Sequence, residues 1–396
     1  MTSPLLPETG HDEGPVTPIE DTGAAQPPAA APAPPPPAPP RNVRFPLLWL
    51  MDNGSPSVQY RAINDVARLT DRLPEKAKDL ALASPGAVAL ALTQRPDGVW
   101  NDSMLTVPAP SARHFAGVGT INASRRLLEY GWSKDTPPLA CSRRILFRLL
   151  AEDDSPEYLF ELGRERRLNE DLVRQGRGLL REAAAATLAQ AGYEGDPRLR
   201  GAARRILDRI TAYLRSPLAQ KPFVRFGNQH ALPPEAAPPS LYSLAMLAHM
   251  PLFRQEHYDA MERLYAHIAT SAPRMDPVQM CGGELLPMPH FVLGDPLPTR
   301  NAGDADIPYT MHWLELMARL GFLKRNEGWT KLYDRFLDCC DSQGVFRPSK
   351  GMGMTSANPF VWHMFPIDEG DETGVVDATF RLGLIGRVAG RTIEVV

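Results

Sequence analysis

The residue types best suited to chemistry gather in the last third of the chain. Five ring side chains stand among loops rich in proline and methionine: His312, Trp313, Phe360, Trp362 and His363. Aromatic faces attract cations and pack well against large apolar molecules, and methionines add an adaptable lining. The pattern predicts a cavity that binds an apolar ligand and steadies positive charge within it. The alternative is that these side chains belong to the ordinary core.

Two groups of carboxylates flank these rings. Asp304 and Asp306 stand directly before an expected helix, and Asp368 to Glu372 form an acidic run before the last one. Oxygen ligands suit Mg²⁺, so the acidic run is a candidate for holding that ion with a diphosphate. Each group also has a simpler interpretation, because Asp caps helix starts and acids favour helix N-termini. We expect no cofactor, with Mg²⁺ as an alternative.

The elements that must position these groups are helices. Apolar residues recur at helical spacing from Ser55 to the C-terminus. First helices of successive pairs start near residues 57, 115, 170, 238, 306 and 374, so the unit recurs roughly every 55 to 68 residues. Strand signals are confined to residues 223–226 and 392–396. The pattern predicts an all-α chain of about five to six helix pairs.

Residues 84–102 contain the most specific local signature. Ser84-Pro85 is a helix-start signal, and Pro96-Asp97-Gly98 is a tight turn that stops the helix. Gln94 precedes this turn and Trp100 follows it. A glutamine side chain can donate to and accept from the unpaired groups of neighbouring helix ends, and a tryptophan can cover that polar bridge. We expect Gln94, Gly98 and Trp100 to be structural.

Gln94-x-x-x-Gly98-x-Trp100 after an apolar helix resembles the repeated Gln/Trp motif of squalene and other terpenoid cyclases. Residues 48–62 also resemble the N-terminal segment of bacterial squalene-cyclase-like proteins, and residues 343–346 form a degenerate second copy of the turn. The resemblance implies an α/α toroid, the fold shared with protein prenyltransferase β subunits, over residues 44–396. A HEAT-like solenoid is the alternative, although its usual unit is shorter, at about 40 to 47 residues.

The resemblance also implies a reaction. Class II terpenoid cyclases use an Asp-x-Asp-Asp loop whose middle acid protonates an alkene or epoxide. Asp304 and Asp306 match the first two acids, and Ile307 replaces the third. By the resemblance, Asp306 would donate the proton with Asp304 as its partner, in a central cavity that binds an isoprenoid. The prenyltransferase branch implies a transferase with zinc, for which Asp338, Cys340 and His363 are the alternative ligands.

Two further functions remain open. A toroid that kept the fold and lost the acid loop would be a non-catalytic scaffold or partner-binding protein, with a filled centre and no converging acids. A glycan-processing enzyme would need two carboxylates facing an open polar cleft. Glu284 with Asp304 or Asp306 is the candidate pair for that chemistry.

The amino-acid composition limits the classes of partner and the cellular compartment that we expect. The net charge of −3 argues against a nucleic-acid binder. Residues 1–43 read as a disordered arm, acidic and rich in proline and alanine, whose protein partner the sequence leaves unspecified. Four cysteines without a CxxC spacing favour a reducing, cytoplasmic location. We expect no transmembrane segment, while peripheral contact with a membrane stays open.

Overall fold

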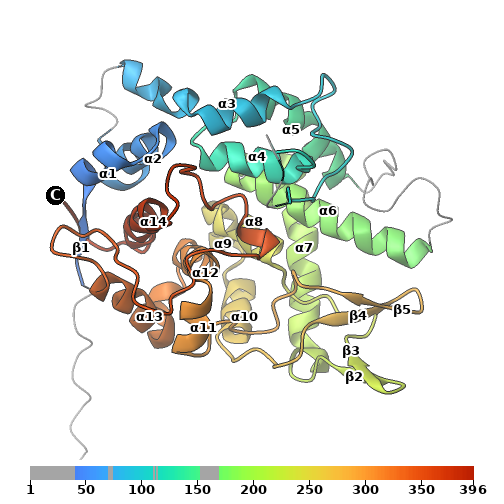
Figure 1. The fold of residues 1–396 in the computed structure, drawn as a ribbon. Coiled ribbons are helices and arrows are strands. Elements are labelled where there is room, and N and C mark those ends of the chain that lie inside the picture. Colours follow the sequence, from blue (N-terminus) through green and yellow to red (C-terminus); the bar gives the residue numbers. More distant parts are fainter. Residues whose placement is uncertain (1–40, 70–74, 110–111, 113–114, 152–168) are drawn as a thin grey trace, which may run out of the picture. The chain divides into compact units, whose positions relative to one another are not determined.

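The computed structural model describes residues 41–69, 75–109, 112, 115–151 and 169–396 (Figure 1). These residues are mostly α-helical, with three two-stranded sheets among them. The all-α class is therefore confirmed, and the sheets are minor additions. The arm predicted for residues 1–43 lies outside the described residues except for its last three. Pro40–Val396 forms one compact unit.

Helices occur along the whole described chain, as the recurrence of apolar residues predicts. The α-helices of the described residues are α1 (Leu47–Asn53), α2 (Pro56–Arg61), α3 (Pro85–Leu92), α4 (Thr120–Glu129), α5 (Pro137–Leu150), α6 (Glu170–Gln190), α7 (Pro197–Arg215), α8 (Leu241–Ala248), α9 (Pro251–Glu256), α10 (Tyr258–Ile268), α11 (Arg300–Ala305), α12 (Ile307–Arg319), α13 (Glu327–Asp338) and α14 (Val375–Val388). A π-helical segment, η1 (Ala62–Ala67), continues α2. Short 3₁₀ segments include η3 (Glu75–Ala83), before α3, and η8 (Pro359–Val361).

Proline sets the starts of three helices that the sequence located. α3, α5 and α7 each begin with proline in the first turn, where its missing N–H costs no hydrogen bond. Asp196 also caps α7, because its side chain accepts from the Arg198 N–H. Ser84 and Thr136 make no such bond. The expected side-chain cap at Ser84 is therefore replaced by the proline alone.

Four helices end in the same motif. A glycine with positive φ follows each of α4, α6, α12 and α14, at Gly131, Gly192, Gly321 and Gly390. The next residue donates its N–H to a carbonyl five positions earlier, as in the pairs Trp132–Leu127, Tyr193–Leu188, Phe322–Met317 and Arg391–Gly386. This is the Schellman ending, which pairs carbonyls that a helix C-terminus leaves free and reverses the chain.

Six helices pack side by side and hold most of the buried polar residues; we call α2, α4, α6, α8, α12 and α14 the core helices. α4 contacts α6, α6 contacts α8, α8 contacts α12, and α12 contacts α14. α14 in turn contacts η1, the continuation of α2, and Figure 1 shows α14 between α2 and α12. Four further helices pack against the core helices, and we call them the outer helices. α3 contacts α4, α5 contacts α4 and α6, α7 contacts α6 and α8, and α13 contacts α12 through Trp329 and Trp313.

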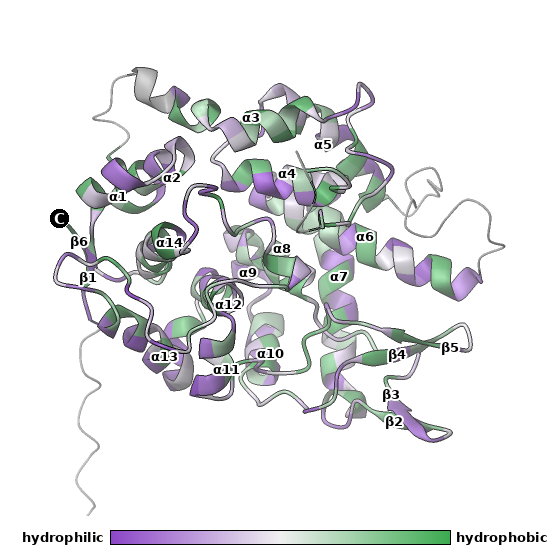
Figure 2. Ribbon diagram, viewed as in Figure 1, coloured by the Kyte–Doolittle hydropathy of each residue, from purple (hydrophilic) through white to green (hydrophobic). Residues whose placement is uncertain are grey.

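The apolar core joins the core helices to their outer neighbours. Every residue of α8 is buried, and Figure 2 shows this helix as largely hydrophobic. The small side chains of Ala183, Ala184, Ala185 and Ala186 on α6 are also buried, which permits close packing against α8. Trp313 of α12 meets Trp329 of α13 edge to face, at 6.0 Å between ring centroids. Such burial supplies the main favourable term in folding.

Of the three strand pairs in the described residues, one joins distant parts of the chain and two are local hairpins. β1 (Val43–Phe45) pairs in parallel with β6 (Ile393–Val395), which brings the first and last described elements together. β2 (Val224–Phe226) pairs with β3 (Gln229–Ala231), and β4 (Val278–Cys281) pairs with β5 (Glu284–Pro287), both antiparallel. Both strand segments expected from the sequence are therefore strands.

The turn at Gln94 links neighbouring elements. The Gln94 amide donates to the carbonyls of Gly98 and Pro138, at 3.0 and 2.9 Å, and so ties the end of α3 to the start of α5. The Trp100 ring is fully buried, and its Nε1–H donates to the Leu90 carbonyl at 2.9 Å. Gln94 and Trp100 therefore make the kind of structural contacts that their residue types predict.

The degenerate turn has the same geometry. Gly98 and Gly344 have φ of 92° and 90°. The N–H of Trp100 donates to the Thr120 hydroxyl in α4, and that of Phe346 donates to the Thr379 hydroxyl in α14, both at 3.0 Å. Each turn therefore joins an outer helix to the core helix that follows. The two copies are equivalent in structure although their sequences differ.

Candidate functional site

The two acids of the expected proton-donor loop are engaged in local contacts. Asp306 is the N-cap residue of α12, where its Oδ1 accepts from the Tyr309 N–H at 2.9 Å and its Oδ2 accepts from the Ser356 hydroxyl. Asp304 forms ion pairs with Arg335 and with Arg300. Neither acid lines either of the two large cavities described below. The geometry therefore favours the capping interpretation of Asp306.

The predicted cavity aromatics divide into two sets. Trp362 lines a cavity, whereas His312, Trp313, Phe360 and His363 do not. Three of these four side chains are buried, and Phe360 is partly buried against the Tyr242 ring, at 5.6 Å between centroids. Four of the five rings thus pack inside the protein.

Trp362 belongs to a cavity of about 740 Å³, which we call the acidic cavity. Its apolar wall includes Phe115, Met354, Trp362 and Phe365. Five carboxyl groups complete the lining: Asp368, Glu369, Asp371, Glu372 and Asp377. No lysine, arginine or histidine is among its lining residues in the described chain. The cavity therefore combines aromatic surface with negative charge.

Several of these carboxyls hold the loop before α14 in place. Asp371 accepts from the N–H groups of Val376 and Asp377, at the start of α14. Asp377 is fully buried and accepts from the N–H groups of Ile367 and Asp368, at 3.2 and 3.3 Å. Burial raises the pKa of Asp377 to about 7, against the opposing effect of Arg381. Asp371 of the acidic run and the nearby Asp377 thus have structural roles.

The structure brings none of the alternative ligand sets together. Within the described ranges, no three His, Cys, Asp or Glu side chains are grouped so as to hold a metal ion. His363 packs against His312, whereas the Cys340 thiol contacts the Phe336 carbonyl at the end of α13. Glu284 is exposed on β5, apart from the residues that line the acidic cavity. Neither zinc nor a carboxylate pair with Glu284 is supported by these positions.

Between the core helices lies an ion-pair network that the sequence did not reveal. We call Arg61, Glu129, Glu315, Arg319 and Arg381 the central charge cluster. Glu129 accepts from Arg61 at 2.6 Å and from Arg381. Arg381 also pairs with Glu315 at 3.0 Å, and Glu315 pairs with Arg319 at 2.8 Å. The Arg381 side chain is 0% exposed, so the centre of the network is enclosed by protein, whereas Arg319 is 22% exposed.

Both acids of the central charge cluster stay ionised. Burial alone would raise the pKa of Glu129, but Arg381 and Arg61 bring that pKa well below its usual value. Arg319 and Arg381 likewise overcome the effect of burial and lower the pKa of Glu315 to about 2. These carboxylates therefore act as fixed charges that pair with buried guanidinium groups, and they are poor candidates for proton transfer near neutral pH.

A loop closes the space beside the central charge cluster. Arg126 donates to the carbonyls of Trp362 and Pro366, and Arg381 donates to the Met364 carbonyl at 3.3 Å. His363 lies 5.8 Å from His312 between ring centroids, and burial lowers the pKa of both, so both rings are neutral. Residues 359–366 thus fill the space between α4, α12 and α14.

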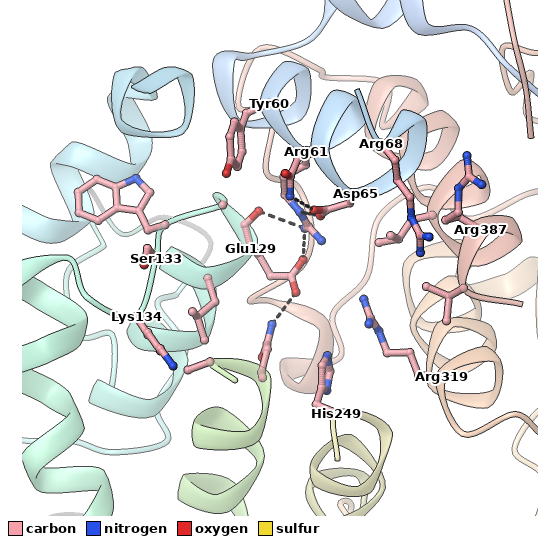
Figure 3. Close-up of a pocket in the computed structure, with 18 residues that line it drawn as sticks. Tyr60, Arg61, Asp65, Arg68, Glu129, Ser133, Lys134, His249, Arg319 and Arg387 are labelled. Carbon is pink, nitrogen blue, oxygen red and sulfur yellow. Dashed lines mark hydrogen bonds and ion pairs between the residues drawn. The ribbon is translucent and has the colours of Figure 1, made fainter. Parts of the chain in front are cut away.

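A second large cavity, of about 610 Å³, lies at the C-terminal ends of the core helices; we call it the basic pocket (Figure 3). Its lining side chains include five cations, Arg61, Arg68, Lys134, Arg319 and Arg387, and two carboxylates, Asp65 and Glu129. Figure 3 shows Arg68, Arg319 and Arg387 on one side and Lys134 on the other. The Arg61–Glu129 pair lies between them.

The repeated helix ending explains how distant residues meet in the basic pocket. Glu129, Gln190, Arg319 and Val388 each stand two positions before the glycine that ends their helix, and all four line the pocket. His249, at the end of α8, joins them. The sequence signal for this arrangement was the recurrent Gly-aromatic pair at residues 131–132, 192–193 and 321–322, which sequence reasoning did not use to align the helices.

Comparisons with known proteins identify no relative: the chain matches no family model, no curated protein and no solved structure. The resemblance to terpenoid cyclases therefore remains a prediction from the Gln/Trp turn. Among the described residues, no helix combines the length and the apolar character needed to cross a bilayer.

Proposed function

We propose that this chain is an α/α toroid that binds an uncharged apolar small molecule, of the isoprenoid class, in the acidic cavity. The observation that carries the proposal is the cavity of about 740 Å³ with Phe115, Trp362 and Phe365 in its wall. Its size falls within the range of small-molecule sites, about 300–1,000 Å³. Its mixture of apolar walls and a few polar groups is also typical of such sites.

Three features support the toroid as the fold. The core helices contact one another in sequence order from α4 to α14, and α14 contacts η1. The two equivalent turns, at Gly98 and Gly344, each precede a core helix. The pairing of β1 with β6 joins the ends of the helical series. A HEAT-like solenoid would leave its first and last repeats apart, because each repeat contacts only its neighbours.

The charge of the acidic cavity selects among apolar ligands. Among the described residues that line the cavity, none carries a positive charge beside these carboxyl groups. A free diphosphate would meet like charge there, and like charges in a partly enclosed site repel strongly. An isoprenoid alcohol or hydrocarbon avoids this cost. We therefore expect an uncharged isoprenoid to bind more tightly than the corresponding prenyl diphosphate.

Binding without cyclisation fits the geometry better than acid catalysis. A proton-donating carboxyl must reach the substrate, whereas Asp306 caps α12 and Asp304 pairs with Arg335. Asp377 lines the cavity, but its oxygens accept backbone N–H groups and its side chain is fully buried. The proposal therefore retains the ligand of the cyclase hypothesis but omits its reaction. It also places the ligand in the acidic cavity, because residues 359–366 fill the space between α4, α12 and α14.

The test is ligand capture by the purified protein. Native mass spectrometry and solvent extraction would identify any apolar molecule that co-purifies, and titration with farnesol and with farnesyl diphosphate would measure relative affinity. Two variants address the acidic cavity: Trp362→Leu removes an aromatic wall, and Ala89→Phe fills space, because Ala89 also lines the cavity. Tyr258→Ala, which changes an exposed aromatic on α10, is the matched control.

We expect farnesol to bind wild type and Tyr258→Ala equally and to bind both cavity variants more weakly. Thermal unfolding of each variant would establish that it is folded. If wild type captures no apolar molecule and binds no farnesol, the scaffold function is favoured. If Ala89→Phe folds and binds farnesol as wild type does, the ligand lies elsewhere.

A further inference from the structure

The basic pocket lies at the opposite end of the core helices from the acidic cavity. Pro308 and Asp377, near the starts of α12 and α14, line the acidic cavity. Arg319 and Arg387, at the ends of the same helices, line the basic pocket. The two cavities therefore have separate linings and opposite charge, and an occupant of one need not resemble an occupant of the other.

The cations of the basic pocket exceed its carboxylates by three, five against two. Both carboxylates are already engaged with Arg61, Asp65 at 2.8 Å and Glu129 at 2.6 Å. Arg319 pairs with Glu315, which lies outside the lining. Arg68, Lys134 and Arg387 form no ion pair with a described carboxylate. The excess positive charge is thus concentrated on side chains that no described acid neutralises.

Arg68 and Arg387 are neighbours of like charge. Burial, followed by the charge of Arg68, lowers the pKa of Arg387. Arg387 donates its Nε–H to the Val66 carbonyl at 2.7 Å, and its two terminal nitrogens have no hydrogen-bond partner among the described residues. Like charges placed together raise the free energy of the folded state. An anion between them would reverse that cost.

Helix C-termini offer a competing explanation. Six core helices end at this pocket, and the partial negative charge of a helix C-terminus favours nearby cations. The bond from Arg387 to Val66 fits that role, because Val66 lies in the last turn of η1. Arg68 does not fit it. Its side chain is exposed and donates to no described helix carbonyl, although it faces the pocket in Figure 3.

We infer that the basic pocket binds a small molecule that carries multiple oxyanion groups, with Arg68, Arg319 and Arg387 as its principal contacts. Guanidinium groups present paired donors that match phosphate and carboxylate oxygens. A volume of about 610 Å³ exceeds what one phosphate needs, so the pocket suits a diphosphate or a polycarboxylate. Lys134, whose ammonium group lies 4.7 Å from the centre of the Tyr193 ring, adds a cation on the opposite side. This inference does not depend on the ligand of the acidic cavity.

Calorimetric titration and thermal unfolding test the site, with inorganic phosphate, inorganic diphosphate and citrate as probes against sodium chloride at matched ionic strength. Arg68→Gln and Arg387→Gln remove charge from the pocket. Arg263→Gln is the matched control, because Arg263 is exposed on α10 and is not among the residues that line the pocket.

We expect diphosphate or citrate to raise the unfolding temperature of wild type and Arg263→Gln above the chloride value. Each pocket variant should weaken binding by about tenfold, the usual effect of losing a charge-assisted hydrogen bond. A higher affinity for diphosphate than for citrate would indicate a ligand with phosphate groups. A higher affinity for citrate would indicate a ligand with carboxylate groups. Arg68→Gln should leave the unfolding temperature without anions unchanged or raised, because it relieves repulsion.

Two results would overturn the inference. The first is that none of the three probes stabilises wild type beyond chloride. The second is that Arg68→Gln lowers the unfolding temperature without anions and leaves anion affinity unchanged, as expected if the cations only neutralise helix ends. Farnesol binding by Arg68→Gln, measured in parallel, separates this site from the acidic cavity, because the variant should bind farnesol as wild type does.

Discussion

Replacing Glu129 with glutamine tests whether the central charge cluster supports the fold. The change preserves size and removes the charge that pairs with Arg61 and Arg381. Breaking a buried ion pair usually costs about 3–5 kcal/mol, because an uncompensated charge stays in the interior. Each arginine keeps a second carboxylate, Asp65 for Arg61 and Glu315 for Arg381. We therefore expect the lower end of the range, about 3 kcal/mol.

Urea unfolding at pH 7 measures this loss. With a slope of about 1–3 kcal/mol per molar, a loss of about 3 kcal/mol lowers the midpoint by about 1 M or more at constant slope. Glu327→Gln is the control, because it removes an exposed carboxylate that pairs with Lys331 on the surface of α13. That variant should unfold at the wild-type urea concentration, since exposed pairs contribute little.

The same variant predicts a change in acid stability. The folded-state pKa of Glu129 is depressed, so its stabilisation is present above its unfolded value and is lost as pH falls towards the folded value. Wild type should therefore lose stability below about pH 4.5, and Glu129→Gln should show a shallower loss. Two results would show that water reaches these charges and that the reasoning from burial is wrong. Glu129→Gln would lower the free energy of unfolding at pH 7 by less than about 1 kcal/mol, or its loss of stability in acid would equal that of wild type.

Two further predictions concern single sites. Gly383→Ala should lower the free energy of unfolding by about 1–3 kcal/mol, because its new methyl group would collide with the buried Phe45 ring. Gly201→Ala, where the nearest atom is 3.8 Å away, should stabilise α7 by about 0.5–1 kcal/mol. Equal effects of the two variants in urea unfolding would contradict this packing. Burial raises the folded pKa of Asp377 to about 7, so ionisation opposes folding and stability falls as pH rises from about 4 through 7. Asp377→Asn should abolish that slope and gain at least about 1 kcal/mol at pH 8, whereas the exposed Asp52→Asn should keep the wild-type profile.

Local chemistry explains which parts of the fold were predictable. Proline at the starts of α3, α5 and α7 and glycine at the turn after α3 act within a few residues, so their effects are visible in the sequence. The degenerate turn at Gly344 was also recognisable, because the backbone needs the same positive φ there. The capping role of Asp306 belongs to this group as well.

Contacts between residues far apart in the sequence explain which features could not be predicted from it. Glu129 and Arg381 are 252 positions apart, and no local pattern connects them. Likewise, the sequence suggested one aromatic cavity, whereas burial divides its rings between the acidic cavity and the core. Which side of a helix faces a neighbour depends on how the neighbours pack. Residue type alone therefore located the rings without showing which of them a ligand can reach.

The sequence by itself determined the helical class, the helix starts at prolines and the turns at glycines, because steric and hydrogen-bonding limits act over short distances. Only the tertiary structure decided which charges meet. Helices far apart in the sequence end at the same place, and packing then brings Arg68, Arg319 and Arg387 to one pocket. It also brings Glu129 to Arg381 in the central charge cluster. Electrostatic function depends on such distances and on burial, and both are properties of the folded chain.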